Sequence, residues 1–238
     1  MKTILHKSET RGHANHGWLD THHTFSFANY YQQDRVNFGA LRVLNDDWIA
    51  AGEGFGTHPH DNMEIITIPV SGVVEHKDSM GNHGTIKAGE IQVMSAGTGI
   101  FHSEYNHEKT IPLELFQIWV FPNKRNVTPR YDQISLADIE KIDEFFQILS
   151  PNPNDQGVWI HQNAWFHLGN LSEGWEGEYE LKDKKNGVYF FVIEGNVSVE
   201  GQELSRRDGL GVSEVSAVKI KSNSITKLLV MEIPMAEN

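Results

Sequence analysis

The sequence predicts an all-β fold divided between two domains. Short runs rich in β-branched and aromatic residues recur at close spacing, and long apolar stripes with the 3.6-residue period of a helix are scarce. The chain has 238 residues, of which 39% are hydrophobic, so it can build one large or two small cores. A polar stretch near the middle favours two domains, which we expect at 1–130 and 131–238.

The first half is expected to form strands joined by hairpins. Turns at Ser71-Gly72 and between Ser79 and Gly84 supply the Gly and Asn residues that positive backbone φ angles favour. The stretch GFGTHPHDNMEI, residues 54–65, also has the pattern of a strand. The other expected strands are 39–45, 63–70, 73–78, 90–95, 100–105 and 113–121.

The middle of the chain, residues 122–143, is polar and irregular, and Ser135 is placed to cap one short helix. The second half then resumes the β pattern. IPVSGVVEH (68–76) and VIEGNVSVEG (192–201) each contain an apolar strand, a glycine turn and a second strand, which indicates an internal duplication. The expected strands of the second half are 158–161, 187–194, 196–199 and 226–233.

Composition excludes several classes of function. Twenty Lys and Arg against 32 Asp and Glu give a formal charge of −12, which disfavours direct binding of nucleic acid. The chain has no cysteine, so any metal chemistry must use histidines and carboxylates. No apolar run is long enough for a signal peptide or a membrane span. We therefore expect a cytoplasmic protein without membrane contact.

Two pairs of residues have the spacing of metal ligands on strands. Alternate side chains of a strand share a face, so His58 and His60 point the same way, as do His102 and Glu104. Together they would offer three imidazoles and one carboxylate, which suit a divalent transition metal. Pro59 favours a strand end or a cavity rim. In a chain with 13 histidines, the first pair alone is equally compatible with a polar turn.

The glycines around these pairs decide between the two readings. Gly52, His58, His60 and Glu64, followed by Gly97, Gly99, His102 and Asn106, resemble the two motifs of the cupin superfamily, although Gly72 comes one residue late and Gly97 replaces a proline. The first half is also similar to the pirin family, two-domain cupins that include bacterial quercetin 2,3-dioxygenases. The blocks that carry this resemblance are RGHANHGWLDTHHTFSFANYY, GFGTHPHDNMEI, VEHKDSMGN, MSAGTGIFHSEYN and LELFQIWVFP.

The resemblance implies a bicupin, with two jelly-roll-like barrels and one divalent metal ion in the first. Its ligands would be His58, His60, His102 and Glu104, whereas Glu64 stands where many other cupins place their ligand. We expect iron(II), and nickel, copper, manganese, cobalt and zinc are also compatible. The second half has no H-x-H pair and no second-motif histidine, so we expect it to lack a metal, with His161 and His167 structural or exposed.

The resemblance also implies an activity, the opening of the central ring of flavonols such as quercetin by dioxygen with release of carbon monoxide. Glu104 would act as general base as well as ligand, and Gln117 is a candidate polar partner of the site. One alternative is a non-catalytic metal or redox sensor that acts through a protein partner, and another is a zinc hydrolase. A pocket beside the metal would distinguish an enzyme from a sensor. We expect a monomer, because two fused barrels can pack on each other.

The remaining histidines are expected to have structural or surface roles. His13, His16, His22 and His23 follow no ligand spacing, and the aromatic residues around them predict a strand packed by rings. His76 and His83 flank a turn, which predicts a solvated hairpin.

Overall fold

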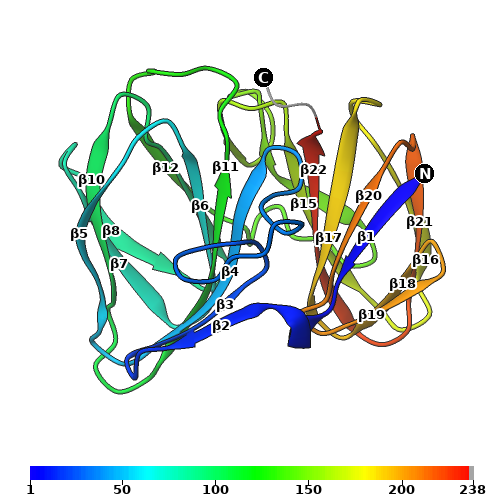
Figure 1. Cartoon of the computed structure of the whole chain (residues 1–238), viewed down its shortest axis with the longest axis horizontal. Coiled ribbons are helices and arrows are strands. Elements are labelled where there is room, and N and C mark those ends of the chain that lie inside the picture. Colours follow the sequence, from blue (N-terminus) through cyan, green and yellow to red (C-terminus); the bar gives the residue numbers. More distant parts are fainter. Residues whose placement is uncertain (236–238) are drawn as a thin grey trace.

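A computed structural model of the chain describes residues 1–235 and confirms the all-β prediction. Two β-barrels lie side by side (Figure 1), and each consists of a seven-stranded and a four-stranded sheet. Apart from strands, the described residues contain one 3-10 helix, Ser8–Thr10. Within residues 1–235 no helix has the length and apolar character needed to cross a membrane.

The first barrel contains most of the strands expected from the sequence. Its long apolar strands, such as β6 and β11, pair in the centre of the seven-stranded sheet. Its strands are β2 (Gly12–Asn15), β3 (Leu19–His23), β4 (Leu41–Ile49), β5 (Gly54–His60), β6 (Glu64–Ser71), β7 (Val73–Asp78), β8 (His83–Lys87), β9 (Glu90–Ser95), β10 (Ile100–Asn106), β11 (Leu113–Val120) and β12 (Arg130–Ser135).

The second barrel consists of the strands from β13 onward and of β1, the first strand of the chain. Its strands are β1 (Lys2–His6), β13 (Phe145–Ser150), β14 (Val158–Trp159), β15 (Trp165–Leu171), β16 (Glu176–Glu180), β17 (Asn186–Glu194), β18 (Asn196–Val199), β19 (Gln202–Ser205), β20 (Gly209–Ser213), β21 (Ala217–Ser222) and β22 (Thr226–Pro234).

The two barrels share one topology. The large sheets have the orders β12-β9-β6-β11-β4-β3-β2 and β1-β20-β17-β22-β15-β13-β14, and the small sheets β5-β10-β7-β8 and β16-β21-β18-β19. The hairpin β6–β7 passes from the large to the small sheet of the first barrel, as β17–β18 does in the second. This correspondence agrees with the internal duplication suggested by the two hairpin sequences, which stays a prediction.

β12 and β1 are the corresponding edge strands of the two seven-stranded sheets, β12 in the first barrel and β1 in the second. β12 pairs with β9, whereas the first strand of the chain pairs with β20 in the second barrel. The helix expected at Ser135 is wrong: residues 130–135 join the sheet through their backbone, and Ser135 Oγ accepts a hydrogen bond from Ala137 within a turn. The expected domain boundary at residue 130 coincides with the start of β12 and stays a prediction.

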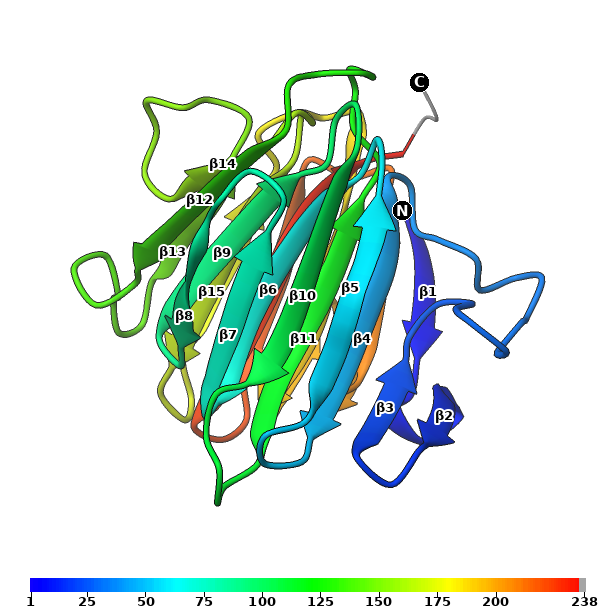
Figure 2. The same ribbon diagram turned by 90° about the vertical axis from the view of Figure 1, so that its left-hand side faces the viewer.

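The largest apolar core lies between the two seven-stranded sheets, which face each other at the centre of Figure 1. It joins side chains of both barrels, for example Leu44 and Phe116 with Phe191 and Met231. The chain begins with β1 in the second barrel, crosses to the first barrel with β2 and β3, and reaches β4 beside this core. Figure 2 shows β2 and β3 next to β4 on the first barrel. This N-terminal arm, residues 12–30, builds one wall of the site described next.

Candidate metal centre

The two predicted pairs lie on neighbouring strands. His58 and His60 are on β5, an edge strand of the small sheet, which agrees with the position expected for Pro59. β10 pairs with β5 so that His102 lies opposite His58. Gly54 permits this close pairing, because a Cβ atom there would lie 2.3 Å from the carbonyl oxygen of Glu104.

The structure brings His58, His60 and His102 together. One nitrogen of each lies within 4.8 Å of those of the other two. Their ring centroids are separated by 4.4 Å (His58–His102) and by 4.9 Å for both other pairs. His58 Nδ1–H donates to the carbonyl of Gly56 over 2.8 Å, which leaves Nε2 free to bind an ion. This is the usual way in which a protein orients a histidine ligand.

These histidines fit a metal ion on two further observations. Both ring nitrogens of His102 are buried and have no hydrogen-bond partner within residues 1–235, an arrangement that is unfavourable unless a ligand binds there. Burial, reinforced by His102 and His58, lowers the pKa of His60 to about 4. Burial, reinforced by His58 and His76, lowers the pKa of His102 to about 3. Both imidazoles are therefore neutral at pH 7, the form that binds metals.

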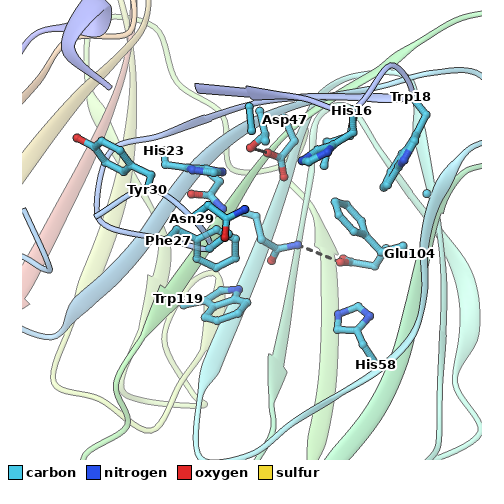
Figure 3. A pocket seen from close by; sticks show the side chains of 18 of the residues that line it. His16, Trp18, His23, Phe27, Asn29, Tyr30, Asp47, His58, Glu104 and Trp119 are labelled. Carbon is cyan, nitrogen blue, oxygen red and sulfur yellow. Dashed lines mark hydrogen bonds between the residues drawn. The ribbon is translucent and has the colours of Figure 1, made fainter. Parts of the chain in front are cut away.

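Glu104 is buried beside His102, but it belongs to an adjoining group of potential ligands with His102 and His76 rather than to the group of three histidines. Its Oε1 accepts a hydrogen bond from Thr67 Oγ1 over 3.2 Å. Its Oε2 accepts one from Gln117 Nε2 over 3.0 Å, the dashed contact in Figure 3. Gln117 is thus a polar partner of the site, as expected, and Thr67 was not foreseen.

His76 was also missed, and for this residue the predicted solvated hairpin is wrong. The side chain is buried, its ring lies 4.9 Å from that of Tyr131 on β12, and Asp78 contacts it over 3.2 Å. The signal was the alternation of Val74, His76 and Asp78, which face the interior on β7. His83 is exposed, as expected.

The histidine cluster opens onto a cavity of about 800 Å³. Its walls are largely apolar and include the aromatic residues Trp18, Phe27, Tyr30, Phe55 and Trp119. Figure 3 shows the rings of His23, Phe27 and Tyr30 on one side of the hollow and Glu104 and His58 on the other, with Trp18 above Glu104. The packing of Trp18 against Phe55 confirms that aromatic residues hold the strand predicted around His22. The cavity is of a size that ordinarily holds small organic ligands.

One wall of the cavity carries a second carboxyl group, which sequence reasoning missed. Asp47 on β4 is buried and lines the cavity, and its Oδ1 accepts a hydrogen bond from Thr21 on β3. Burial raises the pKa of Asp47 to about 7, although the Thr21 hydroxyl opposes the shift. The strand period could have revealed it, because Asp47 shares its face with the buried residues Val43, Asn45 and Ile49.

Glu64 lies outside these groups of potential ligands and does not line the cavity. It is buried on β6, and its Oε2 accepts a hydrogen bond from Ser95 Oγ over 2.7 Å. Burial raises its pKa to about 7, against the effects of Ser95, His161 and Arg130.

The remaining histidines are distributed as follows. His13 and His22 stack with ring centroids 4.4 Å apart on the exposed side of the arm, where Asp20 joins them in a third group of potential ligands. The structural role expected for them stays a prediction. In the second barrel, His167 is buried against Tyr179, which agrees with a structural role, and His161 is partly exposed.

Comparison with known proteins agrees with this fold. Residues 5–120 match the family model described as Pirin, and residues 147–233 match the one described as Quercetinase C-terminal cupin domain. The chain is 44% identical over 230 residues to quercetin 2,3-dioxygenase of Escherichia coli K12, covering 97% of this chain and 98% of that protein. It is 37% identical over 222 residues to a pirin-like protein of Caulobacter vibrioides, covering 93% and 95%.

A solved structure extends the agreement to the arrangement of the two barrels. The crystal structure of the bacterial pirin YhhW from Escherichia coli in complex with nickel(II) superposes with a TM-score of 0.93 at 43% identity, covering 99% of this chain and all of that one. Family, fold and sequence therefore agree over nearly the whole length. The chain belongs to the pirin family of bicupin proteins.

Proposed function

We propose that His58, His60, His102 and Glu104 bind one divalent metal ion, with iron(II) as the physiological ion. The clustered imidazoles, the unpartnered nitrogens of His102 and the nearby carboxylate support this assignment. Imidazole and carboxylate ligands suit iron(II), and they equally bind nickel(II), the ion in the complex of the related pirin. Glu104 shares a group of potential ligands with His102, and each of its carboxylate oxygens keeps a lone pair for the ion beside the hydrogen bonds from Thr67 and Gln117.

We further propose that the protein is a flavonol dioxygenase of the quercetin 2,3-dioxygenase type. The observation that carries this proposal is the aromatic-walled cavity onto which the histidine cluster opens. A sensor that acts only through a protein partner has no need of an internal cavity of this size. The name of the 44% identical relative, quercetin 2,3-dioxygenase, supports the same substrate class.

The residues of the chain would divide the work as follows. A bound metal ion lowers the pKa of a hydroxyl group that coordinates to it. Glu104 would accept the proton of the flavonol 3-hydroxyl at a carboxylate oxygen, and the donors Thr67 and Gln117 hold that carboxylate in place. Phe27, Phe55 and Trp119 would orient the flat rings and exclude water. In the net reaction, both atoms of dioxygen enter a phenolic ester and one ring carbon leaves as carbon monoxide.

The test is aerobic turnover of quercetin by protein loaded with iron(II) or nickel(II), followed through the loss of flavonol absorbance. Mass spectrometry should show a product whose mass equals quercetin plus dioxygen minus carbon monoxide. Metal-stripped protein serves as the control and should leave quercetin intact. Equal turnover by loaded and stripped protein, or a product that has kept the carbon atom, would contradict the proposal.

A further inference from the structure

Asp47 is the charged residue of the cavity that the proposed reaction does not use. Figure 3 shows its carboxyl group pointing into the hollow, at the end away from His58. It is held in position, because β4 pairs with β3 and β11 on its two sides and Thr21 on β3 donates to Oδ1. Strand pairing on both sides and this hydrogen bond therefore fix the position of the carboxyl group.

The second oxygen of this carboxyl group has no hydrogen-bond partner within the described residues. The Thr21 contact uses Oδ1 alone, and Asp47 lines the cavity. This oxygen faces the cavity, so it is free to accept a hydrogen bond from a donor on a bound ligand. The nearby Asn45 side chain also lines the cavity and makes this end polar.

We propose that Asp47 binds a phenolic hydroxyl on the part of the substrate that lies farthest from the metal-binding oxygens. The inference rests on the proposed function and narrows its substrate class to flat aromatic molecules with hydroxyl groups at both ends. The aromatic walls between the two ends accept the rings, and Phe55 has no polar group with which to distinguish one hydroxylated ring from another. Selectivity therefore depends on the polar end.

The character of the Asp47 carboxyl group agrees with this role. Since burial raises its pKa to about 7, both protonation states are present near neutral pH, and either can hydrogen-bond a phenol. A site built to hydrogen-bond a hydroxyl discriminates strongly against an analogue that lacks it, because the polar group is then left unpaired.

The experiment compares two ligands that share the metal-binding end. Quercetin carries hydroxyls on its outer rings, whereas 3-hydroxyflavone carries none. Nickel(II)-loaded protein is titrated with each under anaerobic conditions, with quenching of tryptophan fluorescence as the readout. The variants are Asp47→Leu, which removes the acceptor, Asp47→Asn, which keeps one acceptor oxygen, and the exposed Asp138→Asn as the charge-matched control.

We expect the wild type to bind quercetin about tenfold more tightly than 3-hydroxyflavone, the effect of one hydrogen bond to a buried carboxyl group. Asp47→Leu should abolish this preference and leave affinity for 3-hydroxyflavone within about twofold, and Asp47→Asn should retain part of it. If Asp47→Leu does not fold, Asp47→Asn decides alone, with an expected reduction of the preference to about threefold.

An unchanged preference in the variants, or an equal loss of affinity for both ligands, would overturn the inference. If that occurs in a wild type that opens the quercetin ring, the proposed function stands and only the role of Asp47 is wrong. A wild type that binds neither flavonol contradicts both.

Discussion

The two barrels have the same strand order, yet one is hollow and the other is filled. Corresponding strands can be matched through their backbone contacts: Asn106 N donates to the residue before β5, and Ser222 N donates to the residue before β16. Counting back along each strand, Val218 holds the place of His102, and Ile220 holds that of Glu104. Neither aliphatic side chain can bind a metal ion.

The difference extends through the interior of each barrel. In the second barrel, Val218 and Ile220 belong to one continuous apolar cluster that includes Tyr179 and Phe190. Inside the first barrel, the apolar residues form two separate clusters, one around Ile49 and one around Met94. Members of both clusters line the cavity together with polar residues such as Gln117. A hollow barrel gives up burial of apolar area, and the core shared by the two large sheets offsets that loss.

The largest effect is expected when His102 of the first barrel is replaced by valine, the residue at the corresponding position 218 of the second barrel. His102→Val should abolish metal retention and turnover, because one of three clustered imidazoles is lost. The free energy of unfolding of the metal-free protein should stay within about 1 kcal/mol, since the variant also removes two buried nitrogens without partners. Metal content after dialysis and urea denaturation measure the two effects, with the exposed His83→Val as control. Retention of one metal per chain would contradict the assignment.

Two buried glutamates sharpen the comparison next. Glu104→Gln should retain much of the metal and lower kcat about 100-fold or more, because the proposed base is lost. Glu232 in the second barrel accepts hydrogen bonds from Lys182 N, Asp183 N, Tyr179 and Asn186. Glu232→Gln should therefore lower the free energy of unfolding by about 3 kcal/mol with turnover per folded molecule unchanged. Kinetics and denaturation of both variants are the measurements, and exchanged phenotypes would refute the division of roles.

A third difference concerns pH. The pKa of Glu64 is raised from 4.5 to about 7 in the folded protein, so its proton stabilises the fold fully below pH 4.5 and this contribution is lost as the pH rises to 7. Glu64→Gln should change stability little at pH 4 and increase the free energy of unfolding by about 3 kcal/mol at pH 8. Urea denaturation at both pH values measures the effect. If Glu64→Gln increased the free energy of unfolding equally at pH 4, the increase at pH 8 could not be caused by burial of the charged carboxylate.

The smallest effect is expected at Thr67, which contacts Glu104 without contacting a histidine of the cluster. Thr67→Val removes one hydrogen bond to the carboxylate and should lower kcat about threefold to tenfold, with metal content unchanged. Thr24→Val is the matched control, because its buried hydroxyl has no partner within residues 1–235. Equal values of kcat for the two variants would show that Thr67 does not position Glu104.

The sequence was sufficient to predict strands with long apolar runs and a nearby turn, such as β6, β11 and β17. It was also sufficient for the histidines, because their period of two residues is local. It was insufficient for β1, whose residues are largely exposed, and for β12, whose residues are half-buried. Both strands pair with partners that are distant in the sequence. Their positions are fixed by tertiary pairing, which no local pattern records.

The same distinction holds within the site. Tyr131 of β12 packs on His76, and the N-terminal arm pairs with β4 beside Asp47, so distant segments help to form both environments. The pattern of buried positions on β4 and β7 contained the signal, yet His76 was assigned to a solvated hairpin and the strand expected at 39–45 ended before Asp47. Polar residues at interior positions of a strand are therefore the place to search for functional groups.

The central claim is that the hollow, histidine-bearing barrel performs a metal-dependent ring opening. The most direct test is the carbon monoxide released when iron-loaded protein meets quercetin in aerated buffer, with metal-stripped protein as the baseline. The account predicts one molecule of carbon monoxide for each quercetin consumed, and none without metal. No release with iron, nickel, manganese or copper would contradict it.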